Sequence, residues 1–331
     1  MELSNKAAYL LSPNSPLIKV KSAPIPRPGP NELLVRIEAV AINPVDAVKQ
    51  SMGNMMFEWL TYPLILGYDV AGKVVKAGAD VSQFKEGNRI VGLAAGMDKR
   101  GRRPDEGAFQ ELVVIREHLA IRVPAGVKSA DASVLPLTAI KAHLKPAAGY
   151  DVIAMASPKS WDTVRSLGAV AVFDYRISSV IDNIIASLKD KKYAGAIAIS
   201  QGSLARYIDI IKKIPNATKN IAHITLDMPA SPPTSKLSLV PFVAKYLWLS
   251  SINRLKVLSS RVRSKFVFRT DIMDWDAEGK ISLFLSEALE LGEYTLPSEA
   301  RVIGTGLESI SEGLDKVRNE ASKKKIVVVL E

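Results

Sequence analysis

The order of apolar and polar runs between residues 150 and 175 constrains the fold more than any other feature of this sequence. A short apolar run at 150–156 (YDVIAMA) follows a glycine, which is typical of a buried parallel strand. The polar SPKS at 157–160, a helix-like WDTVRSL and a second apolar run at 170–173 (VAVF) come next. This order predicts a strand, a helix and a strand, with Ser157 as the N-cap of the helix.

The part of the chain before residue 150 is shorter than a complete nucleotide-binding fold requires. Such a fold opens with a strand, a glycine-rich turn and a helix, and the turn presents backbone N–H groups to a pyrophosphate. Here the helix-like LPLTAIKAHL at 135–144 leads through Lys145 and Pro146 directly into the strand at 150–156, and the chain contains no G-x-G-x-x-G. A strand and crossover helix of roughly 30 residues or more are therefore absent from the expected order. The alternative is an ordinary loop in a fold that never had this turn.

Composition limits the remaining possibilities. A chain of 331 residues, 47% of them hydrophobic, is long enough for one large or two medium domains. It contains no cysteine and only three well-separated histidines, so we expect neither disulfides nor a metal site. The N-terminus lacks the features of a signal peptide. The most apolar run, at 237–249, is interrupted by Lys245 and is too short to span a bilayer, which needs ~20 apolar residues. We therefore expect a cytoplasmic protein with no membrane partner.

The net charge of +10 would suit nucleic acid, an anionic membrane or a phosphorylated cofactor. However, the 44 lysines and arginines are interleaved along the chain with 34 acidic residues. The densest basic cluster, Arg254–Lys265 (RLKVLSSRVRSK), is either a phosphate-facing patch or the solvated face of a helix, and we favour the second interpretation. Because no basic motif is interleaved with aromatic residues, we do not expect nucleic acid as a partner.

The first 124 residues contain many short predicted strands separated by glycines and prolines. Strands are predicted at 5–11, 17–22, 33–42, 64–78, 84–93, 107–115 and 118–124. Pro44 ends the third strand, and a helical turn follows up to Gly53. We expect Gly72 and Gly78 at strand corners with positive φ. Short strands with glycine corners are typical of a small barrel-like β domain, and 326–330 is predicted to return as its last strand.

Several segments of the sequence together resemble one enzyme family. They are KAAYLL, PGPNELLVRIEAVAINPVDAVKQ, YPLILGYDVAGKVVKAGADVSQFKEGNRIVGL, EGAFQELVV, LPLTAIKAH, AAGYDVIAMASPKSWDTVRSLGAVAVFDY and IGTGLESISEGLDKVRNEASKKKIVVVL. In this order they are similar to the medium-chain dehydrogenase/reductase superfamily, in its zinc-independent quinone oxidoreductase and enoyl reductase branch. Within that branch the chain most resembles fungal trans-acting enoyl reductases and related dehydrogenases of polyketide pathways. The stretch 204–296 is divergent.

The resemblance implies an α/β fold with three segments. A β-rich GroES-like catalytic domain takes residues 1–124, and an incomplete doubly wound, Rossmann-type nucleotide-binding domain takes residues 125–270. A C-terminal segment, 271–331, returns to the catalytic domain. The zinc-dependent branch uses Cys, His and Cys around its metal, but this chain has no cysteine, and Tyr68 follows Gly67 where a histidine would stand. We therefore expect no zinc.

The resemblance also implies residues that bind the cofactor. In the family, the turn that ends in Asp46 and the following Lys49 line the nicotinamide side of the cleft. A helix N-cap is an equally weighted role for Asp46. The SPKS segment falls where the family holds the adenosine 2′-phosphate, and this assigns Ser157, Pro158, Lys159 and Ser160. No acidic residue ends the preceding strand to bind a free ribose hydroxyl, which favours NADP over NAD. A plain capped helix start is the alternative.

Two further assignments complete the expected site. Tyr175 corresponds to an additional adenosine contact in the family, and a cluster of four residues corresponds to the cleft for nicotinamide and substrate. That cluster is Leu135, Pro136, Leu137 and Thr138. Ordinary helix packing is its alternative role. No catalytic residue is assigned, and neither the substrate nor the oligomeric state can be read from the sequence.

Three functions follow for this chain. The first is a zinc-independent, NADPH-dependent oxidoreductase of secondary metabolism that transfers hydride to an activated C=C or C=O bond of a small molecule, such as a polyketide carried on a synthase. Because the glycine-rich turn is absent, we expect it to bind NADPH weakly. The second is a non-catalytic remnant that acts as a binding or scaffolding module. The third, an RNA-binding protein, has the least support.

Overall fold

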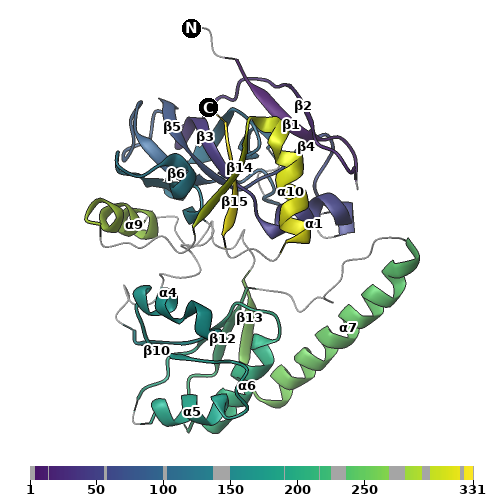
Figure 1. Ribbon diagram of the computed structural model, residues 1–331, viewed down its shortest axis with the longest axis vertical. Coiled ribbons are helices and arrows are strands. Elements are labelled where there is room, and N and C mark those ends of the chain that lie inside the picture. The colour runs from purple at the N-terminus through teal and green to yellow at the C-terminus, as the bar shows by residue number, and fades with distance from the viewer. Residues whose placement is uncertain are drawn as a thin grey trace. The chain divides into compact units, whose positions relative to one another are not determined.

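The computed structural model describes residues 4–13, 15–55, 58–99, 103–136, 150–189, 191–215, 217–224, 236–267, 280–292, 299–320 and 324–330. The chain divides into two compact units (Figure 1). The first unit contains residues 1–147 and 273–331, and the second contains residues 148–272. None of the described helices is long and apolar enough to cross a membrane.

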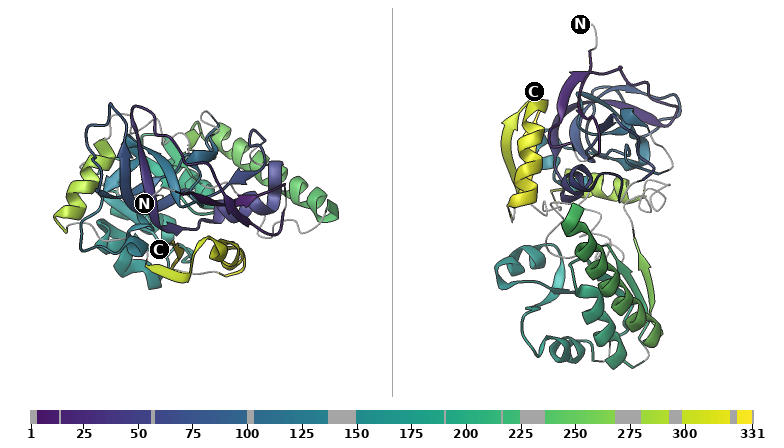
Figure 2. Two further views of the ribbon diagram at one scale, coloured as in Figure 1. Left: turned by 90° about the horizontal axis from the view of Figure 1, so that it is seen from above. Right: turned by 90° about the vertical axis from the view of Figure 1, so that its right-hand side faces the viewer.

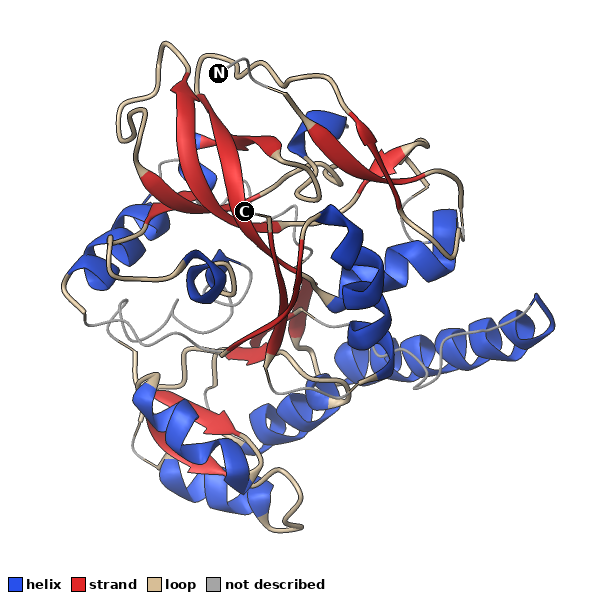
Figure 3. Ribbon diagram, turned by 45° about the horizontal axis from the view of Figure 1, so that its top comes forward, coloured by secondary structure: helices blue, strands red, loops and turns tan. Residues whose placement is uncertain are grey.

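Strands dominate the first unit (Figure 3). A three-stranded sheet has the order β2-β1-β4, and a seven-stranded sheet has the order β14-β15-β3-β5-β6-β8, with β7 also paired to β3. The bounds are β1 (Lys6–Leu10), β2 (Lys19–Ser22), β3 (Glu32–Ala41), β4 (Leu64–Ile65), β5 (Asp69–Ala77), β6 (Arg89–Leu93), β7 (Leu112–Arg116), β8 (Ala120–Arg122), β14 (Ala300–Thr305) and β15 (Lys325–Val329). The helices are α1 (Pro44–Met52), α2 (Ser129–Ala132), α9 (Lys280–Glu290) and α10 (Ile310–Asn319).

Strand β3 organises this unit. It is ten residues long, most of its side chains are buried, and it pairs antiparallel with β5, β7 and β15. Pro44 occupies the first helical position of α1 and ends the strand, as the sequence predicts. The predicted last strand is confirmed as β15, whose residues Val327–Val329 pair with β3. The C-terminal segment therefore completes a sheet that begins near residue 32.

The prediction of positive φ at Gly72 and Gly78 is wrong. Gly72 lies inside β5, which runs straight through the position where a corner was expected, and neither glycine has a positive φ. Both positions require glycine for a different reason. A Cβ on Gly72 would lie 2.1 Å from the carbonyl oxygen of Arg36, and a Cβ on Gly78 would lie 2.0 Å from that of Gly29. Close approach of neighbouring backbones, rather than backbone conformation, excludes a side chain here.

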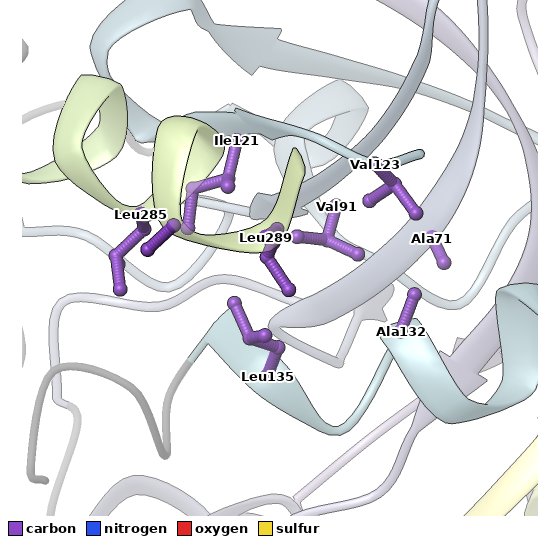
Figure 4. Close-up of a cluster of buried hydrophobic side chains, with 9 residues drawn as sticks. Ala71, Val91, Ile121, Val123, Ala132, Leu135, Leu285 and Leu289 are labelled. Atoms are coloured by element: carbon purple, nitrogen blue, oxygen red, sulfur yellow. The ribbon is translucent and has the colours of Figure 1, made fainter. Parts of the chain in front are cut away.

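Two helices cover one part of the large sheet through a compact apolar cluster (Figure 4). Its members are Ala71, Val91, Ile121, Val123, Ala132, Leu135, Leu285, Ala288 and Leu289. These side chains come from β5, β6, the region of β8, the region of α2, and α9. Residues 129–136, which the sequence assigned to the start of the cofactor domain, thus pack within the first unit.

In the described part of the second unit, five parallel strands form two separate sheets. Strands β9 (Val152–Met155) and β10 (Ala169–Phe173) form one sheet, and β11 (Ala196–Ala198), β12 (Asn220–His223) and β13 (Arg263–Phe266) form the other. The predicted strand, helix and strand after residue 150 are confirmed, with α4 (Trp161–Ser166) between β9 and β10. The remaining helices among the described residues are α5 (Val180–Ser187), α6 (Ser203–Lys213) and α7 (Lys236–Ser259), and α7 contacts α6 near the carboxyl-terminal end of α7 (Figure 1 and Figure 2).

The separation of the two sheets falls where a doubly wound fold has its first strand. A complete fold of this kind has the strand order 3-2-1-4-5-6. If β9 to β13 are strands 2 to 6, the observed orders β10-β9 and β11-β12-β13 reproduce 3-2 and 4-5-6. Among the described residues, no strand lies between β9 and β11. The sheet is therefore interrupted at the position of the strand that the sequence lacks.

Helices hold the two sheets of the second unit together. One apolar cluster joins Ala196 and Ala198 of β11 to Leu204, Ile208 and Ile211 of α6. A second cluster joins α5 and α6 to Met155 of β9 and Phe173 of β10. Since α6 contributes to both clusters, it bridges the interruption. All four residues of β9 are only half-buried, in contrast to the mostly buried β3.

Candidate active site and cofactor-binding residues

The first group of candidate residues lies at the start of α1. Asn43 is the N-cap residue, and its backbone N–H donates to Oδ2 of Asp46 at 2.8 Å. The backbone N–H of Asp46 donates in turn to the carbonyl oxygen of Asn43 at 2.9 Å. Asp46 is therefore the third residue of the helix and not its N-cap, and its fully buried carboxylate closes a capping box.

Lys49 lies one turn further along α1 and is fully buried. Its Nζ donates a hydrogen bond to the carbonyl oxygen of Gly53 at 2.8 Å and lies 5.4 Å from the centroid of the Tyr62 ring. Burial lowers the pKa of Lys49 to about 8, because the charged ammonium is poorly solvated there. A lysine with this pKa exchanges its proton near neutral pH, which suits an acid or base in a reaction.

Tyr62 is a residue that the sequence did not single out. Its hydroxyl is buried and has no hydrogen-bond partner among the described residues. Burial also raises the pKa of Tyr62, so the phenol stays protonated. Its position beside Lys49 depends on a contact between residues 13 positions apart in different elements, and no local sequence pattern reveals such a contact.

Polar contacts fix α1 to the sheet behind it. Asn43 Nδ2 donates to Oδ2 of the buried Asp69 at 3.0 Å, and the ammonium of Lys325 contacts the same carboxylate. Lys325 also donates to the carbonyl oxygen of Val134 at 3.4 Å. Residues of α1, β5 and β15 therefore meet at one buried carboxylate, so the C-terminal segment helps to position the N-terminus of α1.

The predicted substrate residues are only partly described. Leu135 is 1% exposed and belongs to the apolar cluster of Figure 4, and Pro136 is buried. Their surroundings are those of packing residues, the alternative that the sequence left open. Leu137 and Thr138 lie outside the described residues.

The second group of candidate residues lies at the carboxyl ends of β9 and β10. Met155 is paired with Phe173 in the parallel register, and the backbone N–H of Ala156 donates to the carbonyl oxygen of Phe173 at 2.9 Å. This register brings Ser157 and Tyr175, which follow the two strands, to the same edge of the sheet. Carboxyl edges of parallel strands are where ligands bind in doubly wound folds.

The SPKS segment forms a single 3₁₀ turn with Ser157 at its N-cap position. The N-cap of the following helix α4 is Ser160 and not the predicted Ser157. The hydroxyls of Ser157 and Ser160 lie 3.4 Å apart, and both residues are half-buried. Pro158 and Lys159 are exposed. Two hydroxyls and an exposed ammonium on one turn are suitable groups for an anion such as a 2′-phosphate.

Arg206 of α6 adds a second cation that the sequence did not predict. Its guanidinium donates to the carbonyl oxygen of Tyr175 and lies 5.7 Å from the centroid of the Tyr175 ring. Next to it, Asp174 forms a two-pronged ion pair with Arg176, and this hydrogen bonding lowers the pKa of Asp174. Arg206 lies in the divergent stretch 204–296, where no recognisable motif indicated its role.

The residues present fit the adenosine end of a dinucleotide but not its pyrophosphate. A pyrophosphate is held by N–H groups of a glycine-rich turn at a helix N-terminus, directly after the first strand. The sequence has no such turn, and the sheet formed by the described residues is interrupted where its strand belongs. No group of three or more histidine, cysteine or acidic residues that could hold a metal ion occurs in the described part of the chain.

Comparison with known proteins identifies the family. The model of the alcohol dehydrogenase GroES-like domain matches residues 29–125. Dehydrogenase pigH of Monascus ruber is 34% identical over 370 residues, covering 99% of this chain and 100% of that protein. Trans-enoyl reductase tndF of Aspergillus flavipes is 29% identical over 371 residues, covering 100% of both. The chain belongs to the medium-chain dehydrogenase/reductase superfamily, in the branch of fungal dehydrogenases and trans-enoyl reductases.

A solved structure agrees in fold with the chain. An alcohol dehydrogenase superfamily protein from Novosphingobium aromaticivorans has a TM-score of 0.68 at 20% identity, covering 99% of this chain and 100% of that one. The alignment with one of these relatives also contains gaps in this chain. The alignment with pigH spans 370 positions, but this chain has 331 residues, so at least 39 positions are gaps in this chain. That deficit is large enough for a strand and crossover helix of roughly 30 residues.

Proposed function

We propose that this chain is a zinc-independent, NADPH-dependent oxidoreductase of secondary metabolism whose incomplete cofactor domain makes NADPH binding weak and turnover low. Family membership makes the chain an oxidoreductase. The interruption of the sheet between β9 and β11 is the observation that carries the rest of the proposal. It agrees with the missing glycine-rich turn in the sequence and with the 39 or more gaps in this chain in the alignment with pigH.

The reaction class rests on relatives and on Lys49. The relatives are named dehydrogenases and trans-enoyl reductases, and we take the reaction of this chain to be hydride transfer to an activated C=O or C=C bond. Reduction of either bond consumes a proton. Lys49 can hold that proton on Nζ, because its pKa of about 8 keeps the ammonium mostly charged at pH 7 but able to lose its proton. A small-molecule substrate, such as a polyketide carried on a synthase, fits this chemistry.

The preference for NADP over NAD rests on the turn after β9. Ser157, Ser160 and the exposed Lys159 offer two hydroxyls and one positive charge, and Arg206 contacts Tyr175 at the same edge of the sheet. The absence of cysteine, and Tyr68 at the position of the expected histidine, support a reaction without zinc.

Weak cofactor binding follows from the pyrophosphate, which carries two negative charges. In a complete fold its partners are several fixed N–H groups and the positive end of a helix dipole. In this sequence Lys145 and Pro146 replace that turn, and proline donates no N–H. Each lost hydrogen bond to a charged group costs about 1.5–3 kcal/mol, so the loss of several reduces a micromolar affinity to a negligible one.

The test compares the chain with a version in which the missing segment is restored. A strand, glycine-rich turn and helix from a relative are inserted between Lys145 and Ala147, and both proteins are titrated with NADPH by calorimetry. We expect binding at low micromolar concentration only for the restored chain. Low micromolar binding by the original chain would show that another part of the protein holds the pyrophosphate. If neither protein binds, the proposed use of NADPH is wrong.

A second function is favoured by the completeness of the first unit. Its seven-stranded sheet and buried polar network do not depend on the interrupted sheet of the second unit. A non-catalytic binding or scaffolding module is therefore the alternative. Failure of the restored chain to reduce any enone or aldehyde substrate, despite binding NADPH, would favour it.

A further inference from the structure

Helix α7 carries an exposed apolar ridge that the proposed function does not use. The ridge consists of Val240, Leu247, Trp248, Leu255 and Leu258, which are between 57% and 73% exposed. Their positions recur at intervals of 7, 8, 15 and 18 residues from Val240, so they lie on one face of the helix. At 1.5 Å per residue, the ridge is about 27 Å long.

The opposite face of α7 is attached to its own unit. Val257 packs against the apolar cluster formed by α6, β11 and β12. The ridge is therefore distinct from the face by which α7 packs on its own unit. Isolated exposed leucines are ordinary on a protein surface, but a continuous apolar patch is typical of a binding surface.

The charged residues of α7 and of the sequence on both sides of it are all basic. Between Asp227 and Asp271 the sequence contains no acidic residue but eight lysines and arginines. Lys245 and Arg254 are exposed and lie on opposite sides of the ridge, as 100° of rotation per residue requires. A second copy of α7 would bring like charges together, and nucleic acid would leave the apolar ridge without a partner.

We propose that the α7 ridge binds the surface of an anionic lipid bilayer. A helix with tryptophan and leucines on one face and basic residues at its borders can lie in the interface, with the apolar side chains among the acyl chains and the basic groups beside the anionic headgroups. The ridge is convex. A protein partner would need a matching groove to bind it, whereas a bilayer accepts a convex apolar surface without any preformed groove. The proposal departs from the expectation of no membrane partner, which rested on the lack of a membrane-spanning run in the sequence. Binding at the bilayer surface requires no membrane-spanning helix and is independent of NADPH.

The experiment measures co-sedimentation of the full chain with vesicles. One set of vesicles contains phosphatidylcholine alone, and the other also contains phosphatidylserine. We expect binding to the second set that weakens as salt is added, together with a shift of tryptophan emission to shorter wavelength. The Trp248→Phe variant should lose most of that shift but still sediment with the vesicles.

Paired variants separate the ridge from general surface effects. Replacing Leu255 and Leu258 by alanine should lower the partition coefficient at least about tenfold, because less apolar surface enters the bilayer. The control replaces Leu17 and Leu291, which are 61% and 71% exposed elsewhere, by alanine, and should bind like the original chain. Replacing Lys245 and Arg254 by glutamine should lower binding roughly tenfold, whereas the same change at the exposed Lys21 and Lys85 should have a smaller effect.

Three outcomes would overturn the proposal. The first is no sedimentation with anionic vesicles at low salt. The second is equal loss of binding in the leucine variants of the ridge and of the control. The third is unchanged binding of the ridge variant together with loss in the charge variant, which would indicate simple adsorption to any polyanion. Thermal unfolding of each variant, followed by circular dichroism, verifies that the exposed substitutions leave the fold intact.

Discussion

Lys49 gives the chain a pH-dependent stability that can be measured directly. Its ordinary pKa of 10.5 applies in the unfolded chain, and burial lowers the pKa to about 8 in the folded chain. At one pKa unit per 1.4 kcal/mol, the difference corresponds to roughly 3 kcal/mol at most. This free energy is the cost of removing the ammonium of Lys49 from water, since the side chain is fully buried.

The sign of the pH effect follows from the number of bound protons. Below pH 8 both states hold the proton on Lys49, and the cost is fully present. Between pH 8 and 10.5 the unfolded chain still binds a proton that the folded chain has lost, so stability rises with pH. From pH 7 to pH 9 the contribution of Lys49 to the free energy of unfolding should increase by about 1.4 kcal/mol, which is tenfold in the folding equilibrium.

The assay compares the original chain with Lys49→Met by urea denaturation at pH 7, 8 and 9. Methionine keeps the length of the side chain but has no titrating group, so the difference between the two proteins cancels all other titrations. We expect this difference to move by about 1.4 kcal/mol in favour of the original chain. Lys85→Met, at an exposed lysine, is the control, and its free energy of unfolding should change with pH as that of the original chain does. A Lys49→Met difference that stays constant from pH 7 to pH 9 would refute the reasoning.

Three further predictions follow from the contacts described above. Gly78→Ala should destabilise the first unit by about 1–3 kcal/mol, because its Cβ would lie 2.0 Å from a carbonyl oxygen. The control is Gly126→Ala, which has open space around it and should leave the stability unchanged. Thermal unfolding measures both. In the chain with the restored segment, Lys159→Ala should weaken the binding of NADPH about tenfold and leave the binding of NADH almost unchanged. If calorimetry shows an equal loss of affinity for both cofactors, Lys159 acts on folding. Backbone amides of β9 should exchange hydrogen faster than those of β3. Restoring the segment should slow the exchange of the β9 amides and leave that of the β3 amides unchanged. Equal protection of β9 in both proteins would mean that its free edge is already covered.

Features that depend on neighbouring residues were predicted well from the sequence. The third strand was expected at 33–42 and is found at Glu32–Ala41, because its apolar pattern and the following Pro44 are both local signals. The strand, helix and strand after residue 150 were predicted for the same reason. The missing turn was also a local signal, since it is defined by glycines at fixed spacing.

Features that depend on distant residues were missed. The glycine at position 72 was taken as a corner, but what excludes a side chain there is the carbonyl of Arg36 on the next strand. Tyr62 beside Lys49 and Arg206 beside Tyr175 are likewise contacts between separate elements. An apolar pattern also cannot distinguish the buried side of α7 from its exposed ridge, because both sides are apolar.

The interruption in the second unit has a local structural effect because parallel strands are joined through helices. In an antiparallel sheet, loss of a central strand would also remove the hairpins on both sides of it. In this unit α5 crosses from β10 to β11, and α6 packs against residues of both sheets. The two parts of the sheet therefore stay attached although they share no backbone hydrogen bonds among the described residues. What cannot be replaced is the row of N–H groups at the end of the missing strand, since helix packing supplies apolar contacts and no anion-binding turn. The fold of the unit and its capacity to hold a pyrophosphate are thus separable, and restoring the segment should change the second much more than the first.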